Sequence, residues 1–273
     1  MNITFIGGGN MATAMIGGLL AKEFCRKEEL RAVEINPEAR ARLKQNYQIR
    51  CFAHPHEAWA ERHNDIIVFA VKPQQMHEAA RNSGLAANAN LIVSIAAGIT
   101  LTSLSRWLGG HRHLIRAMPN TPALIGEGIT GLYALSDVTE DERKKAEAIL
   151  RAVGPTVWIR EQDQMNAVTA ISGSGPAYVF YFIEAIEEAA KQLGLPLETA
   201  HKLALQTFTG AAILATTSPD PVAVLRERVT SKGGTTERAL KSMEADGIKD
   251  AIVRAVKAAA ERSRELGEEL GRD

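Results

Sequence analysis

The sequence predicts an α/β domain with a doubly wound, mostly parallel sheet over residues 1–160, followed by an all-α domain over residues 161–273. Three observations predict this fold class. Short strand-like apolar runs alternate with amphipathic stretches up to about Ile159, a glycine-rich turn directly follows the first run, and the stretches beyond Arg160 have helical spacing. With 273 residues and 45% hydrophobic content, the chain is long enough to bury the cores of two domains.

The strands expected in the first domain are almost continuously apolar, which is typical of a parallel sheet covered by helices on both faces. They cover residues 2–6, 30–35, 66–71, 91–95, 113–117 and 156–159. Crossover helices are expected at residues 37–46, 74–82 and 101–108, and Thr139 with Glu142 forms a capping-box pattern for a helix through Ala152. In the second domain we expect helices at residues 164–171, 176–193, 197–216, 221–228, 235–245 and 248–270.

A glycine-rich turn joins the first strand to a helix that begins near Gly9. Gly7, Gly9 and Ala12 match the G-x-G-x-x-G/A spacing, in which the first glycine makes the tight turn, the second admits a pyrophosphate, and the small third residue lets helix and strand pack closely. The helix start directs unpaired N–H groups and its positive dipole end at the phosphates. The pattern predicts a dinucleotide site; an ordinary glycine turn is the alternative.

The composition narrows the class of partner. The formal net charge is zero and no basic cluster or acidic tail stands out, which argues against nucleic acid and favours a small-molecule substrate. No apolar run reaches membrane-spanning length and no targeting segment precedes the first strand, so no membrane association is expected. Cys25 and Cys51 are too few for a disulfide framework or a metal site, so we expect no metal and a reducing cytoplasm.

Ligands of open α/β sheets bind beyond the carboxyl ends of the strands, and three segments occupy such places. In residues 69–74, Pro73 ends the strand and turns the chain over the coenzyme, while Lys72 either neutralises a phosphate or is merely solvated. The small residues of 94–98 let backbone approach a ligand closely. Two prolines stiffen the polar loop expected at residues 116–122, which suits the nicotinamide end; a turn without ligand contact is its alternative.

The helical half contains a stretch at residues 177–186 that is apolar on nearly every face. Such a helix must be buried almost all round, and a domain of this size covers it only partly by itself. We therefore expect a homodimer formed through this half, with a central helix of a monomeric bundle as the alternative.

Two small-residue turns open helices in this half, at residues 172–177 and 229–237. The second combines hydroxyl groups with consecutive N–H groups at a helix start, a geometry that grips a carboxylate through charge-assisted hydrogen bonds. An N-cap followed by a flexible loop explains the same residues, so the pattern alone leaves both interpretations open.

Five segments, at residues 7–12, 70–73, 116–123, 173–178 and 229–236, together resemble pyrroline-5-carboxylate reductase in their order and spacing. The resemblance spans the chain and implies reduction of Δ1-pyrroline-5-carboxylate to L-proline by NAD(P)H, the last step of proline biosynthesis. It also implies an N-terminal Rossmann domain and a helical dimerisation domain, with the active site between the coenzyme domain of one subunit and the helical domain of its partner. Some members of the family build rings of dimers.

Residue by residue, the resemblance implies a coenzyme site that binds NADP, with NAD left open. Near the second strand, Glu34 suits the ribose hydroxyls of NAD, whereas Asn36 and Arg40 accommodate a 2′-phosphate. The residues implied to bind the pyrophosphate are Gly7, Gly8, Gly9, Asn10, Met11 and Ala12, those lining the coenzyme are Ala70, Val71, Lys72, Pro73, Ile95, Ala96 and Ala97, and those flanking the nicotinamide are Met118 and Asn120.

For the substrate, the resemblance implies that its carboxylate is bound by Ser231 and by the backbone of Gly233, Gly234 and Thr235. The hydroxyl of Thr236 would then lie near the ring nitrogen and serve catalysis. Many family members have proline where this chain has Lys232. This difference leaves open both the rigidity of the loop and a direct contact of Lys232 with the substrate.

The protein has to align the nicotinamide with the imine carbon, so positioning should dominate catalysis. No histidine lies in the five segments, and we expect the substrate to enter protonated or to gain its proton through Thr236 and water. A β-hydroxyacid dehydrogenase is a competing interpretation, but the first lysine after Gly175 in that helix is Lys191, several turns away from the place where its catalytic lysine is expected. The second competing interpretation is a regulatory protein that binds the coenzyme but catalyses no reaction.

Overall fold

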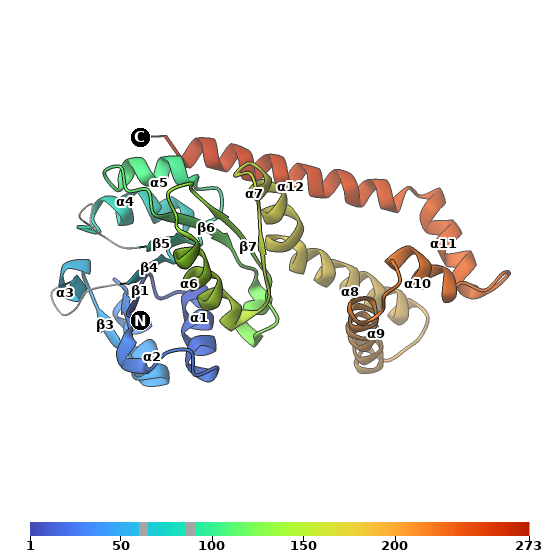
Figure 1. Cartoon of the computed structure of the whole chain (residues 1–273). Helices are drawn as coiled ribbons and strands as arrows, with labels where there is room; N and C mark the ends of the chain where they lie inside the picture. The colour runs from blue at the N-terminus through green and yellow to red at the C-terminus, as the bar shows by residue number, and fades with distance from the viewer. Residues whose placement is uncertain (60–64, 86–90, 273) are drawn as a thin grey trace. The chain divides into compact units, whose positions relative to one another are not determined.

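The computed structural model describes residues 1–59, 65–85 and 91–272 (Figure 1). Its contacts divide the chain into two compact units, Met1–Ser174 with Ala258–Asp273, and Gly175–Lys257, which we call the sheet unit and the helical unit. The division expected from sequence, residues 1–160 and 161–273, follows the change from strands to helices and stays a prediction. The compact units divide elsewhere because the last turns of the C-terminal helix pack within the sheet unit.

Within the described part of the chain, eight strands form one sheet in the order β3-β2-β1-β4-β5-β6-β7-β8. β7 runs antiparallel to β6, and β8 runs parallel to β7, while the other neighbours are parallel, so the predicted mostly parallel, doubly wound sheet is confirmed. The strands are β1 Ile3–Ile6, β2 Leu30–Val33, β3 Arg50–Phe52, β4 Ile66–Phe69, β5 Leu91–Ser94, β6 Leu114–Met118, β7 Thr130–Ala134 and β8 Thr156–Trp158.

Two of these strands, β3 and β7, are absent from the sequence-based expectation. β3 has three residues, too few to show a period, and it lies at the sheet edge beside β2. β7 carries Gly131, a residue that weakens a strand by propensity. That glycine is required by packing, because a Cβ added to it would lie 2.6 Å from Cγ1 of Val168.

Apart from α3, which the sequence analysis does not predict, the helices of the sheet unit follow the predicted elements, and side-chain caps explain the starts of α2 and α6. Asn36 Oδ1 accepts hydrogen bonds from the N–H groups of Glu38 and Ala39 ahead of α2. The capping box of α6 is confirmed, since the N–H of Thr139 donates to Glu142 Oε2 at 2.8 Å and the N–H of Glu142 donates to Thr139 Oγ1 at 3.3 Å. These helices are α1 Asn10–Ala21, α2 Pro37–Tyr47, α3 Pro55–Trp59, α4 Met76–Arg81, α5 Leu101–Trp107, α6 Glu140–Leu150 and α7 Gln164–Val168.

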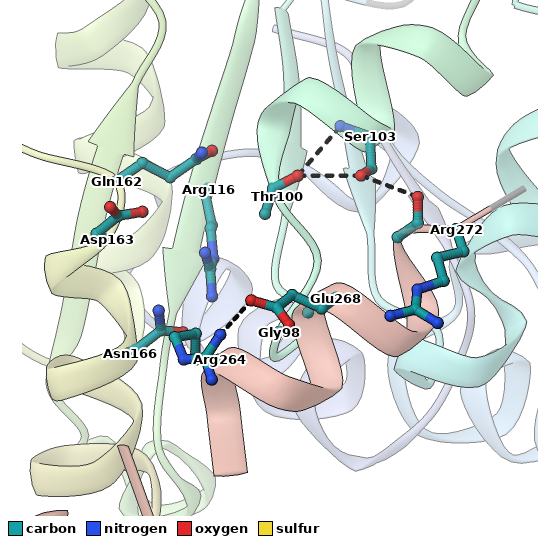
Figure 2. A pocket seen from close by; sticks show the side chains of 12 residues that line it. Gly98, Thr100, Ser103, Arg116, Gln162, Asp163, Asn166, Arg264, Glu268 and Arg272 are labelled. Atoms are coloured by element: carbon teal, nitrogen blue, oxygen red, sulfur yellow. Dashed lines mark hydrogen bonds and ion pairs between the residues drawn. The ribbon is translucent and has the colours of Figure 1, made fainter. Parts of the chain in front are cut away.

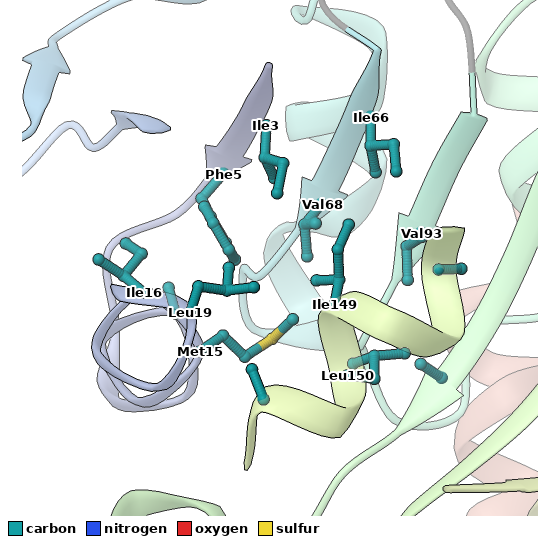
Figure 3. Packing of buried hydrophobic residues seen from close by; sticks show 14 of the residues in the cluster. Ile3, Phe5, Met15, Ile16, Leu19, Ile66, Val68, Val93, Ile149 and Leu150 are labelled. Atoms are coloured by element: carbon teal, nitrogen blue, oxygen red, sulfur yellow. The ribbon is translucent and has the colours of Figure 1, made fainter. Parts of the chain in front are cut away.

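Alternate residues of the central strands pack into two separate apolar clusters, one on each face of the sheet. Ile3 and Phe5 of β1 meet α1 and α6 in the first cluster (Figure 3). Ile6, at the end of the same strand, packs into the second cluster with Met76 of α4 and Leu104 of α5. This period of two places helices on both faces, which leaves the carboxyl edge of the strands for a ligand.

The helical unit contains α8 Gly175–Gln192, α9 Leu197–Thr217, α10 Val222–Arg228, α11 Thr235–Ala245 and the first part of α12 Ile248–Leu270, up to Lys257, and the sequence predicts all five helices. Its core within one chain is small, because the buried apolar residues of this unit are Ile183, Ala200 and Ala204. On α8, Phe180 is 60% exposed and Tyr181 72% exposed. The alternative of a monomeric bundle with α8 as its central helix is therefore wrong.

Across the ranges that the structure describes, no helix is both long enough and apolar enough to span a membrane.

Candidate active site

The segments expected to bind the coenzyme begin at one edge of the sheet. The parallel register pairs Ile6 with Phe69 and Phe69 with Ser94, so residues 7–12, 70–73 and 95–97 leave their strands at the same level. Two backbone hydrogen bonds continue the ladder past the strand ends, from Ala70 N to Ile6 O at 2.7 Å and from Ile95 N to Phe69 O at 3.0 Å. Three separated stretches of sequence are thus held side by side by the sheet itself.

The turn between β1 and α1 has three glycines with different mechanical roles. Gly7 has φ of +100°, and an added Cβ would lie 2.6 Å from the carbonyl oxygen of Ala70, so only glycine fits there. Gly9 is exposed, and a Cβ added to it meets nothing within 4 Å. Gly9 is also the N-cap of α1 and provides no side-chain hydrogen bond, so the first N–H groups of that helix face open space. This end of α1 is built to receive an anion.

At the end of β2, Glu34 is engaged by backbone rather than left free. Its Oε2 accepts the N–H of Gly8 at 2.7 Å and its Oε1 accepts the N–H of Asn36 at 2.8 Å. Arg40 Nη1 donates to the carbonyl oxygens of Glu34 and Ile35 at 2.6 and 2.8 Å. These contacts fix a guanidinium at the strand end, while the carboxylate supports the glycine turn.

Ala70, Val71 and Pro73 are partly buried after β4, whereas Lys72 is exposed. Pro73 begins a short 3₁₀ turn, Pro73–Gln75. It does not end the strand, because β4 already ends at Phe69, two residues before the predicted end at Val71. The structure leaves the two interpretations of Lys72, phosphate contact or solvation, as the sequence left them.

The loop after β6 begins one residue later than expected. The sequence predicts a strand through Ala117 within the segment 116–122, whereas β6 runs through Met118. Because Arg116 pairs with Ser94 of β5 and Tyr133 of β7 inside the sheet, its side chain is 2% exposed. Asn120 Oδ1 accepts the N–H of Ile129 at 2.9 Å, which fixes the start of the true loop.

Met118 is held by a residue from a distant segment. A Cβ added to Gly173 would lie 2.5 Å from Met118 Cε, so glycine is needed for this methionine to keep its place. Gly173 ends a π-helical turn, Thr169–Gly173, that continues α7. The sequence analysis predicted only a small-residue turn opening a helix at 172–177 and did not identify Met118 as a neighbour of Gly173.

The expected substrate-binding residues form one turn of the helical unit, between α10 and α11. Gly233 has φ of +73°, its N–H donates to Glu237 Oε2 at 2.6 Å, and the N–H of Gly234 donates to Ser231 O at 3.0 Å. Gly234 is the N-cap of α11 and supplies no side-chain cap, so the N–H groups of Thr235 and Thr236 start the helix uncapped.

Glu237 contacts the turn expected to bind the substrate, a contact that the sequence analysis did not identify. The pKa of the Glu237 carboxyl is lowered, mainly by the hydrogen bond from the N–H of Gly233. Lys241 Nζ, 3.0 Å from Glu237 Oε1, lowers it further. A carboxylate is thus already bound by one N–H of this turn. The signal was present in sequence, since an acidic residue three positions after an N-cap commonly reaches back to the turn.

The predicted coenzyme residues lie in the sheet unit and the predicted substrate residues in the helical unit. The coenzyme residues lie at strand ends or, for Asn36, at the cap of α2: they are 7–12, 70–73, 95–97, Met118, Asn120 and Asn36. The substrate residues, Ser231 to Thr236, share one turn. Over the described ranges, no group of three or more His, Cys, Asp or Glu residues could hold a metal ion. Cys25 and Cys51 are free and buried, and burial raises the pKa of the Cys25 thiol to about 11.

A parallel sheet with an open glycine turn at its first strand defines the class, a dinucleotide-binding oxidoreductase of Rossmann type. The family model described as pyrroline-5-carboxylate reductase dimerisation matches residues 162–266, and the model described as NADP oxidoreductase coenzyme F420-dependent matches residues 2–98. The chain is 45% identical to pyrroline-5-carboxylate reductase of Pseudomonas aeruginosa over 270 residues, which cover 98% of each chain.

Solved structures agree with this similarity. A pyrroline-5-carboxylate reductase from Coxiella burnetii superposes with a TM-score of 0.87 at 38% identity, covering 97% of this chain and 98% of that one. The Plasmodium falciparum pyrroline carboxylate reductase, solved with NADP bound, gives a TM-score of 0.86 at 32% identity and covers 98% of each chain. The chain belongs to the pyrroline-5-carboxylate reductase family.

Proposed function

We propose that this chain reduces Δ1-pyrroline-5-carboxylate to L-proline, the last step of proline biosynthesis, with a hydride from NAD(P)H. The observation that carries the proposal is the agreement, over nearly the whole chain, with pyrroline-5-carboxylate reductases. The open glycine turn at the first strand supplies the site that such chemistry requires. The chain is therefore an oxidoreductase that acts on a carbon–nitrogen double bond.

The residues at the carboxyl edge of the sheet fit the coenzyme. The space beside Gly9 and the uncapped N–H groups of Asn10, Met11 and Ala12 suit a pyrophosphate. We assign the rest of the coenzyme contacts to Ala70–Pro73, Ile95–Ala97, Met118 and Asn120. When bound, the reduced nicotinamide supplies the hydride, and the work of the chain is orientation.

Contacts at the end of β2 favour NADPH over NADH. Both oxygens of Glu34 already accept backbone N–H groups, so this carboxylate is less available for ribose hydroxyls. Among the described residues, the hydrogen bonds of the Arg40 side chain are made by Nη1, which leaves the rest of its guanidinium for a 2′-phosphate. The side-chain oxygen of Asn36 caps α2, so its NH₂ group is available to donate to the same phosphate.

Arg40→Gln tests this preference. We expect the KM for NADPH to rise about tenfold through loss of one charge-assisted contact, with the KM for NADH nearly unchanged. Steady-state rates with each coenzyme measure it, and equal effects on both would remove Arg40 from the 2′-phosphate site.

The substrate carboxylate is assigned to the turn before α11. The N–H groups of Gly233 and Gly234 already donate hydrogen bonds to Glu237 and Ser231. The groups best placed to bind the substrate carboxylate are therefore the Ser231 hydroxyl and the N–H groups of Thr235 and Thr236. The substrate carboxylate can accept the N–H of Gly233 only if the hydrogen bond from this N–H to Glu237 is broken. Binding is thus coupled to a small rearrangement of this turn.

The Thr236 hydroxyl is assigned to the ring nitrogen. Threonine is a weak acid, so this hydroxyl either orients an imine that arrives protonated or relays a proton from water. Thr236 is partly buried at the first turn of α11, whereas its neighbour Thr235 is exposed, and this difference makes Thr236 the better placed of the two.

We propose that the active enzyme is a cytoplasmic homodimer joined through the helical unit, and that the dimers can assemble further into a ring. The exposed apolar residues of α8 and α9, Phe180, Tyr181, Ile213 and Leu214 among them, support the dimer because burial of such surface drives association. The free, buried thiols of Cys25 and Cys51 fit a reducing compartment.

The direct test mixes the purified chain with NADPH and Δ1-pyrroline-5-carboxylate. Loss of NADPH absorbance should match the appearance of L-proline in equal amounts. Coenzyme binding without oxidation would favour a regulatory protein, and oxidation with a β-hydroxyacid but not with the imine would favour the competing dehydrogenase class.

A further inference from the structure

A pocket of about 420 Å³ lies in the sheet unit, where the last turns of α12 approach β6, α5 and the start of α7. This volume is in the range of small-molecule sites, about 300–1,000 Å³. Figure 2 shows the Arg116 side chain directed between Gln162 and Thr100 toward Asn166 and Arg264. None of the contacts assigned above to coenzyme or substrate uses this pocket.

Arg116 has a buried guanidinium group, one nitrogen of which lacks a hydrogen-bond partner among the described residues. Its side chain is 2% exposed, and its Nη2 has no hydrogen-bond partner within the described chain. Burial lowers the pKa of this guanidinium to about 10, which the charge of Asp163 opposes only in part. A desolvated guanidinium is stabilised by a counter-charge, so the pocket is electrostatically incomplete.

The second arginine of the pocket, Arg264, is already paired with carboxylates. It donates to Glu261, at 2.5 and 3.1 Å, and to Glu268. Arg264 therefore has its counter-charge within the chain, unlike the free end of Arg116.

Two amide side chains add neutral donors. Gln162 Oε1 accepts the N–H of Leu101 at 2.7 Å, and Asn166 Oδ1 accepts the hydroxyl of Ser263 at 2.9 Å. Because both oxygens are used, the NH₂ groups of these amides are the parts left to donate. These donors and the free end of the buried Arg116 guanidinium therefore both match an acceptor-only, negatively charged group.

We propose that this pocket binds a small oxyanion, a carboxylate or phosphate group, through Arg116 with Gln162 and Asn166. The pocket adjoins two segments assigned to the coenzyme, because Gly98 directly follows Ala97 and Arg116 precedes Met118 by two residues on β6. A bound anion would stabilise the sheet unit next to the nicotinamide loop.

The test titrates sodium phosphate and, separately, sodium acetate into protein saturated with NADP and L-proline, by calorimetry at constant ionic strength, so that the proposed pyrophosphate and substrate-carboxylate sites are already occupied. The wild type should bind one anion per chain, and the stronger of the two arms identifies the group. Arg116→Gln should weaken binding about tenfold or more, because a charge-assisted contact is lost. Arg81→Gln, which removes an exposed arginine of α4 that does not line the pocket, is the matched control.

Asn166→Asp keeps the test decisive if Arg116→Gln fails to fold. An aspartate at this position still accepts the Ser263 hydroxyl and supplies the missing counter-charge, so this variant should stay folded and lose anion binding by about tenfold or more. Absence of binding of both anions to the wild type, or equal affinity in Asn166→Asp and the wild type, would overturn the proposal.

Discussion

The sheet unit and the helical unit bury their apolar residues in opposite ways. In the sheet unit, two clusters on the two faces of the sheet are almost fully buried within one chain. In the helical unit, three apolar residues are buried, while α8 and α9 expose large side chains such as Tyr181 and Ile213. One unit is stabilised by its own core, and the other presents its core-like face for a second copy of the chain.

The two units also divide the proposed chemistry. Strand ends of the sheet unit present the coenzyme residues on a rigid frame, whereas the substrate residues lie on a turn of the helical unit whose N–H groups are partly engaged by Glu237. The comparison predicts that substitutions in the first unit act on coenzyme binding and stability of the single chain. Those in the second should act on turnover and assembly.

Gly7→Ala should have the largest effect. The new Cβ would lie 2.6 Å from the Ala70 carbonyl at φ of +100°, which displaces the glycine turn and should weaken coenzyme binding by at least about hundredfold, ~3 kcal/mol. Gly109→Ala is the control, because Gly109 has φ of +67° but an added Cβ meets nothing within 4 Å. Calorimetric titration with NADPH measures both, and similar losses in the two variants would show that backbone strain, and not the clash, is responsible.

Thr236→Ala should lower kcat by about hundredfold, the low end of what a positioned proton-transfer group contributes, and leave the dissociation constant of NADPH nearly unchanged. Thr235→Ala is the matched control on the same turn, and Thr236→Ser should recover most of the activity because it restores the hydroxyl. Full turnover in Thr236→Ala would remove this residue from catalysis.

Tyr181→Asp should break the dimer. A charge placed on this face of α8 opposes burial, and we expect the dimer dissociation constant to rise at least about thirtyfold, ~2 kcal/mol. Tyr181 is 72% exposed within one chain, so the fold of the monomer should survive. Ile125→Asp, at a side chain of the sheet unit that is 79% exposed, is the control. Sedimentation at several concentrations measures both variants; an unchanged dimer in Tyr181→Asp would place the interface elsewhere.

Glu29→Gln should have the smallest effect, confined to the stability of the sheet unit. The ammonium group of Met1, 2.6 Å from Oε1, lowers the pKa of Glu29 to about 2, with a further contribution from the N–H of Arg26. A lowered pKa stabilises the fold above the ordinary value of 4.5, and this stability is lost as the pH falls from there toward about 2. Urea unfolding at pH 7 should show that the free energy of unfolding falls by about 1 kcal/mol, a value reduced because solvent screens this ion pair. The difference from wild type should vanish near pH 2.

The features that could be predicted from the sequence are those set by residues close together along the chain. Every expected strand is present because each is a mostly apolar run, and the helix starts at Asn36 and Thr139 follow from caps only a few residues long. β3 was missed because three residues show no period, and β7 because Gly131 is chosen for packing against Val168 rather than for strand propensity. The site segments were recognised together through family resemblance; their individual roles stay predictions.

The amino-acid sequence by itself determined the local elements, the glycine turn and the apolar character of α8, because each depends on residues that are neighbours along the chain. Tertiary structure decided that Glu34 supports Gly8, that Gly173 leaves room for Met118, and that Arg116 is buried in a pocket under the end of α12. These contacts join residues far apart in sequence, and which residues meet is fixed only when the sheet closes and its two faces are packed.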